Sequence, residues 1–258
     1  MIEGFRIVDA HCHPVSENVN SLVNRYGSPV TAGEFFSEMR SFGIDLCCGS
    51  VIKQIKDPQD FSQFAETNEA GFLLEKEYPG FYQTGIRINP LFKKESLAEL
   101  EKYHRNGVTW LGELVPYMSG YTSYTSPEIL EIFAAARDLG MTVNIHTMDA
   151  DDIDKLMAEL PDLKVVAAHP GDGSLVMTHT ELLKRHKNLH WDISGTGLFR
   201  WGMLRYMVEQ CGAEKILFGT DFPICNVSMQ IYGVLSERIS DEAKAAIFSG
   251  NFDRLCGR

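Results

Sequence analysis

Short apolar runs alternate with longer amphipathic stretches along the whole chain. Eight of these runs are rich in β-branched and small apolar residues, a composition typical of buried strands. They span residues 7–13, 45–52, 82–90, 107–114, 141–147, 164–171, 189–195 and 216–223. The stretches between and after them carry their apolar residues on one helical face. These predicted helices span residues 31–42, 59–78, 93–105, 126–139, 150–160, 175–187, 199–212 and 228–238, with a final helix at 240–255.

Helix boundary signals support this division of the chain. Ser126 precedes Pro127 and Glu128, which is the order of an N-cap, a first-turn proline and a first-turn acid. Glycines stand where a left-handed residue would end a helix before the next strand: Gly43, Gly107, Gly140 and Gly212. Strands that alternate with helices in this way pair in parallel, and continuous apolar strands are buried on both faces.

Eight strand–helix units predict a (β/α)8 TIM barrel of the α/β class, formed by a single domain over residues 1–258. A doubly wound open sheet is the alternative fold. It is disfavoured because no glycine-rich phosphate loop follows the first strand. No linker, charge block or low-complexity segment interrupts the series, which favours one domain.

Composition and charge narrow the possible functions. Apolar residues make up 44% of the chain and charged residues 23%, a balance typical of a globular protein with a large core. The formal net charge of -11 argues against a basic surface for nucleic acid. No apolar run approaches the roughly 18–20 residues that span a bilayer, and residues 1–6 lead into a strand without an apolar signal segment. The six cysteines include no Cys-x-x-Cys pair, which argues against a disulfide framework. We therefore expect a cytoplasmic protein that acts on a small molecule.

Polar residues of metal-ligand type end several of the apolar strands. His11 and His13 share one face of the first strand, because alternate side chains of a strand point the same way. Four further strands each end on one such residue: Glu113, His146, His169 and Asp221. In a barrel the carboxyl ends of the strands meet at one mouth. Four imidazoles and two carboxylates buried there would be unfavourable without a cation, so they predict a divalent-metal site. Nitrogen and oxygen donors favour zinc, with manganese, cobalt or iron as alternatives.

The ordered set of these motifs resembles a known family. A His-x-His pair on the first strand, histidines on the fifth and sixth and an aspartate on the eighth are similar to the amidohydrolase superfamily of metal-dependent barrel enzymes. Val8–His13 and Leu217–Pro223 resemble its amidohydrolase-related (amidohydrolase 2) branch, which contains aromatic-acid decarboxylases and uncharacterised hydrolases. Ala243–Leu255 resembles the closing helix of that branch, so the similarity covers the full length of the chain.

The resemblance implies one of two ligand sets. With two metals, His11, His13 and Asp221 would hold the first. His146 and His169 would hold the second, and Glu113 would bridge the pair, where binuclear members place a carboxylated lysine or a glutamate. With a single metal the implied ligands are His11, His13, His146 and Asp221, which leaves His169 as an electrophile or general acid. In either case a metal-activated water would give its proton to Asp221, which passes it to the leaving group.

Three activities follow as alternatives. The first is a metal-dependent hydrolase that acts on a small carboxylic, amide, ester or phosphoester substrate. The second is a metal-dependent non-oxidative decarboxylase of an aromatic or unsaturated acid, and the third is a non-catalytic metal-binding barrel. The position of Glu113 and a chain too short for the added lid of the decarboxylases favour hydrolysis.

Three residues near the predicted mouth are candidate substrate contacts. Arg87 ends the third strand, where it could bind a substrate carboxylate or phosphate in bidentate fashion or balance the acidic mouth. Tyr117 and Trp201 belong to aromatic loops after the fourth and seventh strands, the latter with Phe199. Such loops could line a specificity pocket or form a homodimer surface.

Two further features near the first strand have open roles. The loop from Val15 to Pro29 is long enough to act as a lid. Asp9 lies one step below His11 on the same face, where it could orient an imidazole or serve as a buried structural acid.

Overall fold

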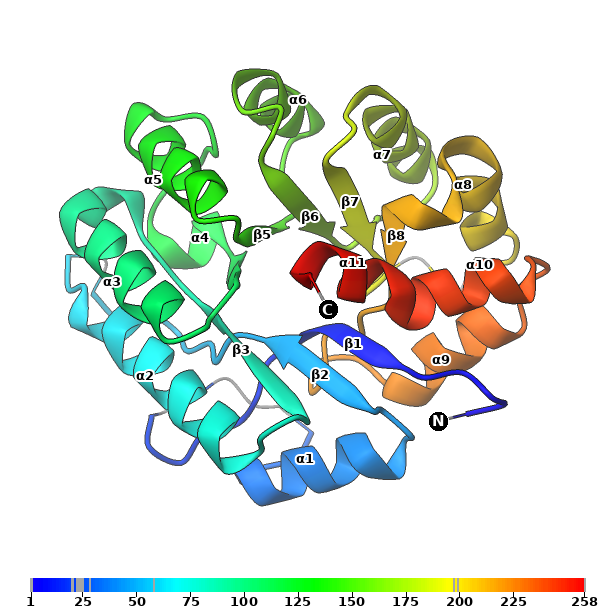
Figure 1. Ribbon diagram of the computed structural model, residues 1–258, viewed down its shortest axis with the longest axis horizontal. Helices are drawn as coiled ribbons and strands as arrows, with labels where there is room; N and C mark the ends of the chain where they lie inside the picture. Colours follow the sequence, from blue (N-terminus) through cyan, green and yellow to red (C-terminus); the bar gives the residue numbers. More distant parts are fainter. Residues whose placement is uncertain are drawn as a thin grey trace.

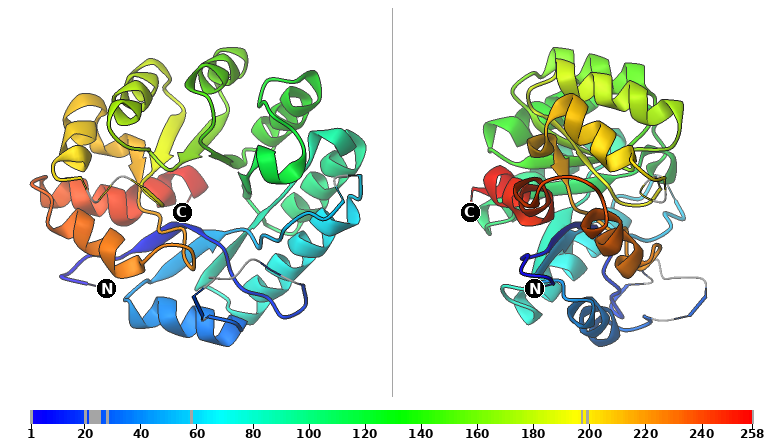
Figure 2. Two further views of the ribbon diagram at one scale, coloured as in Figure 1. Left: turned by 180° about the vertical axis from the view of Figure 1, so that it is seen from behind. Right: turned by 90° about the vertical axis from the view of Figure 1, so that its right-hand side faces the viewer.

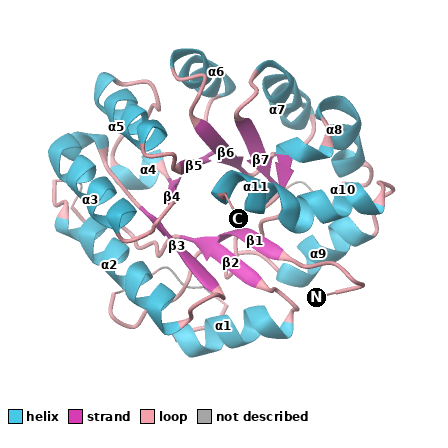
Figure 3. Cartoon of the chain, viewed as in Figure 1, coloured by secondary structure: helices cyan, strands magenta, loops and turns pink. Residues whose placement is uncertain are grey.

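The strands form a parallel barrel in the order β1 to β8, and helices surround it (Figures 1 and 3). The computed structural model describes residues 2–19, 21, 26–27, 29–57, 59–196, 198 and 200–257. The strands are β1 Val8–Cys12, β2 Leu46–Gly49, β3 Tyr82–Ile86, β4 Trp110–Leu114, β5 Thr142–His146, β6 Lys164–Ala168, β7 Leu189–Asp192 and β8 Ile216–Leu217. Backbone bonds join β1 to the chain after β8, since Ala10 N donates to Phe218 O (2.9 Å) and His13 N to Phe222 O (2.8 Å). The predicted (β/α)8 barrel is confirmed.

One main helix follows each strand. These helices are α1 Ala32–Ser41, α2 Ser62–Glu77, α3 Lys93–Arg105, α5 Pro127–Asp138, α6 Ala150–Glu159, α7 Ser174–Arg185, α8 Met203–Cys211 and α9 Val227–Leu235. The predicted start of α5 is confirmed, because the Ser126 side chain accepts a hydrogen bond from Ile129 N. Among the described residues, no helix combines the length and the apolar character needed to cross a membrane.

Several element boundaries differ from the predicted ones near the mouth. The third strand, predicted to reach residue 90, ends at Ile86, and the eighth, predicted over 216–223, covers only Ile216–Leu217. The helices predicted over 59–78 and 199–212 begin later, and the one predicted over 228–238 ends earlier. Buried apolar residues such as Ile88 and Phe218 continue beyond the last paired residues, so the apolar pattern does not mark where strand pairing stops. Three short helices were not predicted. η1 Pro90–Phe92 and α4 Pro116–Ser119 follow β3 and β4 at the mouth, whereas η2 Ala213–Lys215 precedes β8 at the opposite end of the barrel.

The C-terminal segment closes the opposite end of the barrel. The helix predicted at 240–255 is continuous in space but consists of α10 (Asp241–Ala245), the π-helical turn η3 (Ala246–Gly250) and α11 (Asn251–Cys256). Helix α11 lies over the barrel axis in Figure 1 and on one face of the molecule in the right view of Figure 2. Its apolar side chains pack on inward-facing strand residues, and this cluster contains Val8, Ala10, Leu46, Cys48, Trp110, Val166, Leu217, Phe252 and Leu255. The strands can therefore receive a ligand only from the end where their carboxyl termini meet.

His190 on β7 should make the fold sensitive to mild acid. Burial, followed by the charges of Lys215 and Arg254, lowers the pKa of His190 to about 4. The unfolded chain binds a proton at this histidine below about pH 6.5, whereas the folded protein does not until about pH 4, so stability falls as the pH drops through this window. We expect the wild type to lose about 2 kcal/mol more unfolding free energy between pH 7 and pH 5 than His190→Gln loses. Urea unfolding of both proteins in chelator, which removes any contribution of metal release, measures this difference. Equal pH dependence in the two proteins would contradict it.

Candidate metal centre

The first strand brings two histidines together at the mouth. His11 and His13 are 1% and 2% exposed, and their Nε2 atoms lie 3.2 Å apart. The register between β1 and β2 shifts between Asp9 and Cys12, which aids this placement at the end of the strand. Cys12 points away from the centre, with its thiol on Cys48 O, as expected for a packed residue. Two imidazole nitrogens that face each other at this distance form half of a metal site.

Glu113 lies between this pair and a second pair of histidines. Its Oε2 is 3.4 Å from His13 Nε2 and 3.6 Å from His11 Nε2. Its Oε1 is 2.8 Å from His146 Nδ1 and 3.4 Å from His169 Nε2. Each carboxylate oxygen therefore faces a different pair of imidazoles, which is the position of a bridging ligand.

Gly112 allows β4 to present Glu113 in this way. The pairing register of β4 with β5 shifts between Leu111 and Leu114. Gly112 has a φ of +123°, and a Cβ there would lie 2.0 Å from Asn144 O. Only glycine fits this close approach and this backbone conformation, so the residue before Glu113 is determined by backbone sterics.

His169 and Asp221 complete the set from strained backbone positions. Their φ angles are +62° and +65°, in the left-handed region that residues other than glycine rarely adopt. Asp221 Oδ1 lies 3.3 Å from His13 Nε2 and 3.8 Å from His11 Nε2. Strain of this kind persists where the surroundings hold a residue in a functional position. These two residues are also the predicted catalytic pair.

The donor set fits a divalent cation. Among the described residues, two groups of three residues each bring their donor atoms within 4.8 Å of one another. One group is His11, His13 and Asp221, and the other is His11, Glu113 and His169. Donors that bind one ion at about 2.0–2.2 Å lie about 3.0–3.6 Å apart, and most of the separations above fall in that range. His146 joins the set through its contact with Glu113. The structure thus brings together all six predicted ligands.

Opposite charges dominate the electrostatics of the centre. Burial works against the charged form of His13, but the bonds to Asp221 and Glu113 raise its pKa to about 9. Burial opposes the charge of Glu113 as well, yet the neighbouring histidines hold the pKa of this carboxyl well below its usual value. A cation that binds here replaces protons on imidazoles, so binding and proton release are coupled.

Asp192 on β7 orients the centre and was missed in the sequence. Its Oδ2 accepts a hydrogen bond from His11 Nδ1 (2.9 Å), so the Nε2 of that ring faces the mouth. Ser194 connects the same carboxylate to His169, because its Oγ contacts both Asp192 Oδ1 and His169 Nδ1. The available signal was a carboxylate at the end of β7, the position that marks the other candidates.

Asp9 is a buried structural acid and does not orient an imidazole. Its Oδ1 accepts from the backbone N of His11 and of Thr220 (both 3.0 Å), and its Oδ2 accepts from Thr220 Oγ1. These bonds tie β1 to the turn that follows β8. Asp9 therefore holds the backbone of the centre and contacts no imidazole.

The predicted substrate contacts occupy different places. The Tyr117 ring packs edge-on against His146, with the centroids 5.3 Å apart. Arg87 is buried beside Ser119 and Phe64. Trp201 is 67% exposed and contacts Arg238 rather than any of the six donors, so its role stays a prediction. Phe199 lies outside the described residues, as do parts of the predicted lid at 20, 22–25 and 28.

A family comparison identifies the barrel. The model of the amidohydrolase family (Amidohydro_2) matches residues 8–257. The chain belongs to the amidohydrolase family. This confirms the resemblance carried by the strand-end motifs. No curated protein matched the chain in a direct search.

Several solved structures are similar to this amidohydrolase over nearly its whole length. An uncharacterised TIM-barrel protein from Bordetella bronchiseptica has a TM-score of 0.78 and 18% identity, covering 98% of this chain and 100% of its own. A 5-carboxyvanillate decarboxylase from Novosphingobium aromaticivorans, complexed with manganese, has a TM-score of 0.74 and 12% identity over 99% and 97% of the two chains. A probable 2-pyrone-4,6-dicarboxylic acid hydrolase from Acinetobacter baumannii has a TM-score of 0.70 and 15% identity over 98% and 100%. At these identities the likeness establishes the fold, and the fold hosts both decarboxylases and a hydrolase.

Proposed function

We propose that this amidohydrolase is a metal-dependent hydrolase of a small carboxylic, amide, ester or phosphoester substrate. The observation that carries the proposal is Glu113, whose two oxygens face separate pairs of histidines. That arrangement suits two cations with a shared carboxylate. Zinc is the favoured metal because all donors are imidazole nitrogens and carboxylate oxygens. The manganese in the decarboxylase relative makes manganese the first alternative.

A cation held by His11, His13 and Asp221, and a second held by His146, His169 and Glu113, would supply Lewis acidity to a substrate oxygen and to a water. Asp221 is 8% exposed, and its Oδ1 faces both histidines of β1. It accepts the proton from the attacking water and returns it to the leaving group. Asp192 keeps His11 in the tautomer that donates from Nδ1, which leaves Nε2 as a ligand atom. The partner is a small molecule that enters at the mouth, where Tyr117 covers His146.

A decarboxylase is the second candidate. His11, His13 and Asp221 form a three-donor group on their own, which is enough for one cation. His169 would then be available as a general acid, oriented through Ser194 and Asp192. Full-length structural similarity to a decarboxylase supports the same candidate.

One screen tests both reactions in the same samples. Protein loaded with zinc or manganese is incubated with carboxylate-bearing lactones, esters, amides and phosphoesters, and with hydroxybenzoates, in water enriched in oxygen-18. Hydrolysis should place the heavy oxygen in the product and release no carbon dioxide. Chelator-treated protein is the control and should be inactive. Carbon dioxide release without oxygen-18 in the aromatic product would replace the proposal by the decarboxylase, and tight metal binding without turnover would favour a non-catalytic barrel.

A further inference from the structure

Arg87 follows β3 directly and carries a buried guanidinium. The residue is 1% exposed. Its backbone is clamped by Asn68 of α2, which accepts from Arg87 N (2.7 Å) and donates to Arg87 O (3.0 Å). Its Nη2 donates to Ser119 Oγ (3.3 Å), and the guanidinium lies 5.2 Å from the centre of the Phe64 ring. The side chain is thus fixed in place by its surroundings.

The other end of this guanidinium has no acceptor. Arg87 Nη1 is buried and makes no hydrogen bond within the part of the chain that the structure describes. Burial lowers the pKa of Arg87 to about 10, so the group is still charged at neutral pH. A buried cation without a paired anion is unfavourable for folding. It is expected where an anion arrives with a ligand.

Tyr121 places a second unused donor beside it. The residue is 8% exposed, and its hydroxyl also lacks a partner among the described residues. Burial raises the pKa of Tyr121, the charge of Arg87 opposes this rise, and the charge of Glu113 acts on the pKa of both groups. Arg87 directly follows β3 and Tyr121 follows α4 after β4, so both unused donors lie at the mouth end of the barrel, as the metal donors do.

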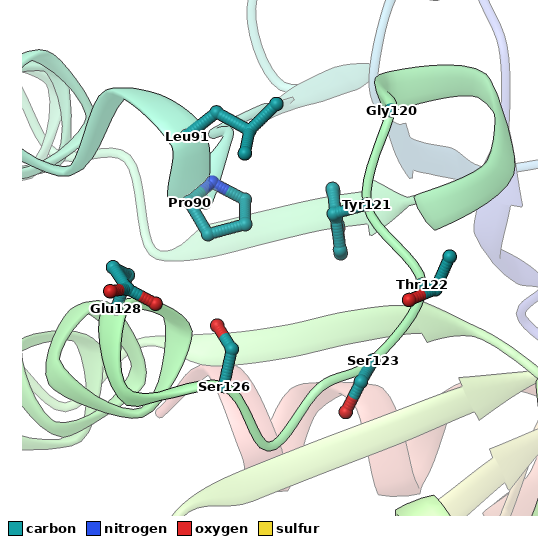
Figure 4. A pocket seen from close by; sticks show the side chains of 8 residues that line it. All are labelled: Pro90, Leu91, Gly120, Tyr121, Thr122, Ser123, Ser126 and Glu128. Atoms are coloured by element: carbon teal, nitrogen blue, oxygen red, sulfur yellow. The ribbon is translucent and has the colours of Figure 1, made fainter.

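A neighbouring cleft is poorly suited to bind the anion that Arg87 lacks. The cleft has a volume of about 450 Å³ and lies between the loops that follow β3 and β4 (Figure 4). Tyr121 lines it, but none of the six metal donors does. The charged residue on its wall is Glu128, an acid that would repel a carboxylate. The side of Tyr121 near Arg87 is therefore the better place for a negative group.

We propose that Arg87 and Tyr121 form a subsite for a carboxylate that the substrate carries in addition to the group presented to the metal centre. The inference rests on the proposed function, since the metal centre must hold the first group. A carboxylate suits the subsite better than a phosphate, because one cation and two donors match one negative charge and two oxygens. The nearby charge of Glu113 further disfavours a dianion.

Binding of simple probes tests the subsite without turnover. Titration calorimetry on zinc-loaded protein compares benzoate with the three benzene dicarboxylates. We expect at least one dicarboxylate to bind the wild type about 10- to 100-fold more tightly than benzoate. Arg87→Met should remove this preference and leave benzoate binding within twofold of the wild type. Tyr121→Phe should reduce the preference about three- to tenfold, and Arg87→Lys should retain part of it.

Stability separates a ligand-binding arginine from a structural one. Because Nη1 is unpaired, Arg87→Met should melt at the same temperature as the wild type or higher. Arg185→Met, which removes a surface pair with Asp154, is the matched control and should leave the dicarboxylate preference unchanged.

The proposal is overturned if the wild type prefers no dicarboxylate, if Arg87→Met keeps the preference, or if Arg87→Met melts well below the wild type. If the dicarboxylate preference depends on Arg87 but the screen detects no hydrolysis, the subsite is supported and the proposed hydrolase activity is wrong. If the screen detects hydrolysis but Arg87→Met keeps the dicarboxylate preference, the hydrolase activity is supported and the subsite is wrong.

Discussion

Glu113→Ala protein should hold close to one divalent cation per chain, where the wild type holds close to two. Glu113 offers one oxygen to the histidines of β1 and the other to His146 and His169. Without the carboxylate, His146 and His169 are too few to hold a second ion. Turnover of any substrate found in the screen should fall at least about 10²-fold, since even partners outside the ligand shell contribute 10- to 100-fold.

Elemental analysis of both proteins, purified without chelator and dialysed against metal-free buffer, measures this loss. Glu237→Ala is a suitable control, because Glu237 is also buried but accepts from Gly202 N instead of facing a histidine. It should keep the wild-type metal content. A content near one in both wild type and Glu113→Ala would place Glu113 outside the ligand set and favour the decarboxylase candidate.

The architecture and the ligands could be predicted from sequence because both depend on local patterns. Continuous apolar runs of seven to nine residues followed by amphipathic helices leave few alternatives to a barrel. Once the barrel is assumed, a polar residue at the end of an apolar strand must lie at the mouth. This is how His11, Glu113 and Asp221 were found without any knowledge of their contacts.

The roles of the residues that support the centre could not be assigned in this way. The bond of Asp192 to His11 joins positions 181 residues apart, and it exists only because β7 and β1 lie on either side of β8 once the barrel closes. Asp9 and Asp192 are both acids in strands that the sequence predicts as buried. Only the folded structure shows that Asp9 binds the backbone of His11, whereas Asp192 binds its imidazole ring. The missing partner of Arg87 Nη1 is likewise a property of packing, which no sequence pattern records.

Asp221→Asn should lower kcat about 10²- to 10⁴-fold, the usual contribution of a positioned general base. The amide keeps the size of the side chain and one oxygen that can face His13, but it cannot accept the proton of the attacking water. The left-handed φ of +65° at this position is tolerated by asparagine as well as by aspartate, so the substitution should not disturb the turn. Metal content, measured first on the same sample and restored with added metal if needed, separates loss of ligation from loss of the base. Asp138→Asn, at an exposed pair with Arg137 on α5, is the control and should retain full activity. A kcat within threefold of the wild type at full metal occupancy would remove Asp221 from the proton transfer and leave His169 as the group to test next.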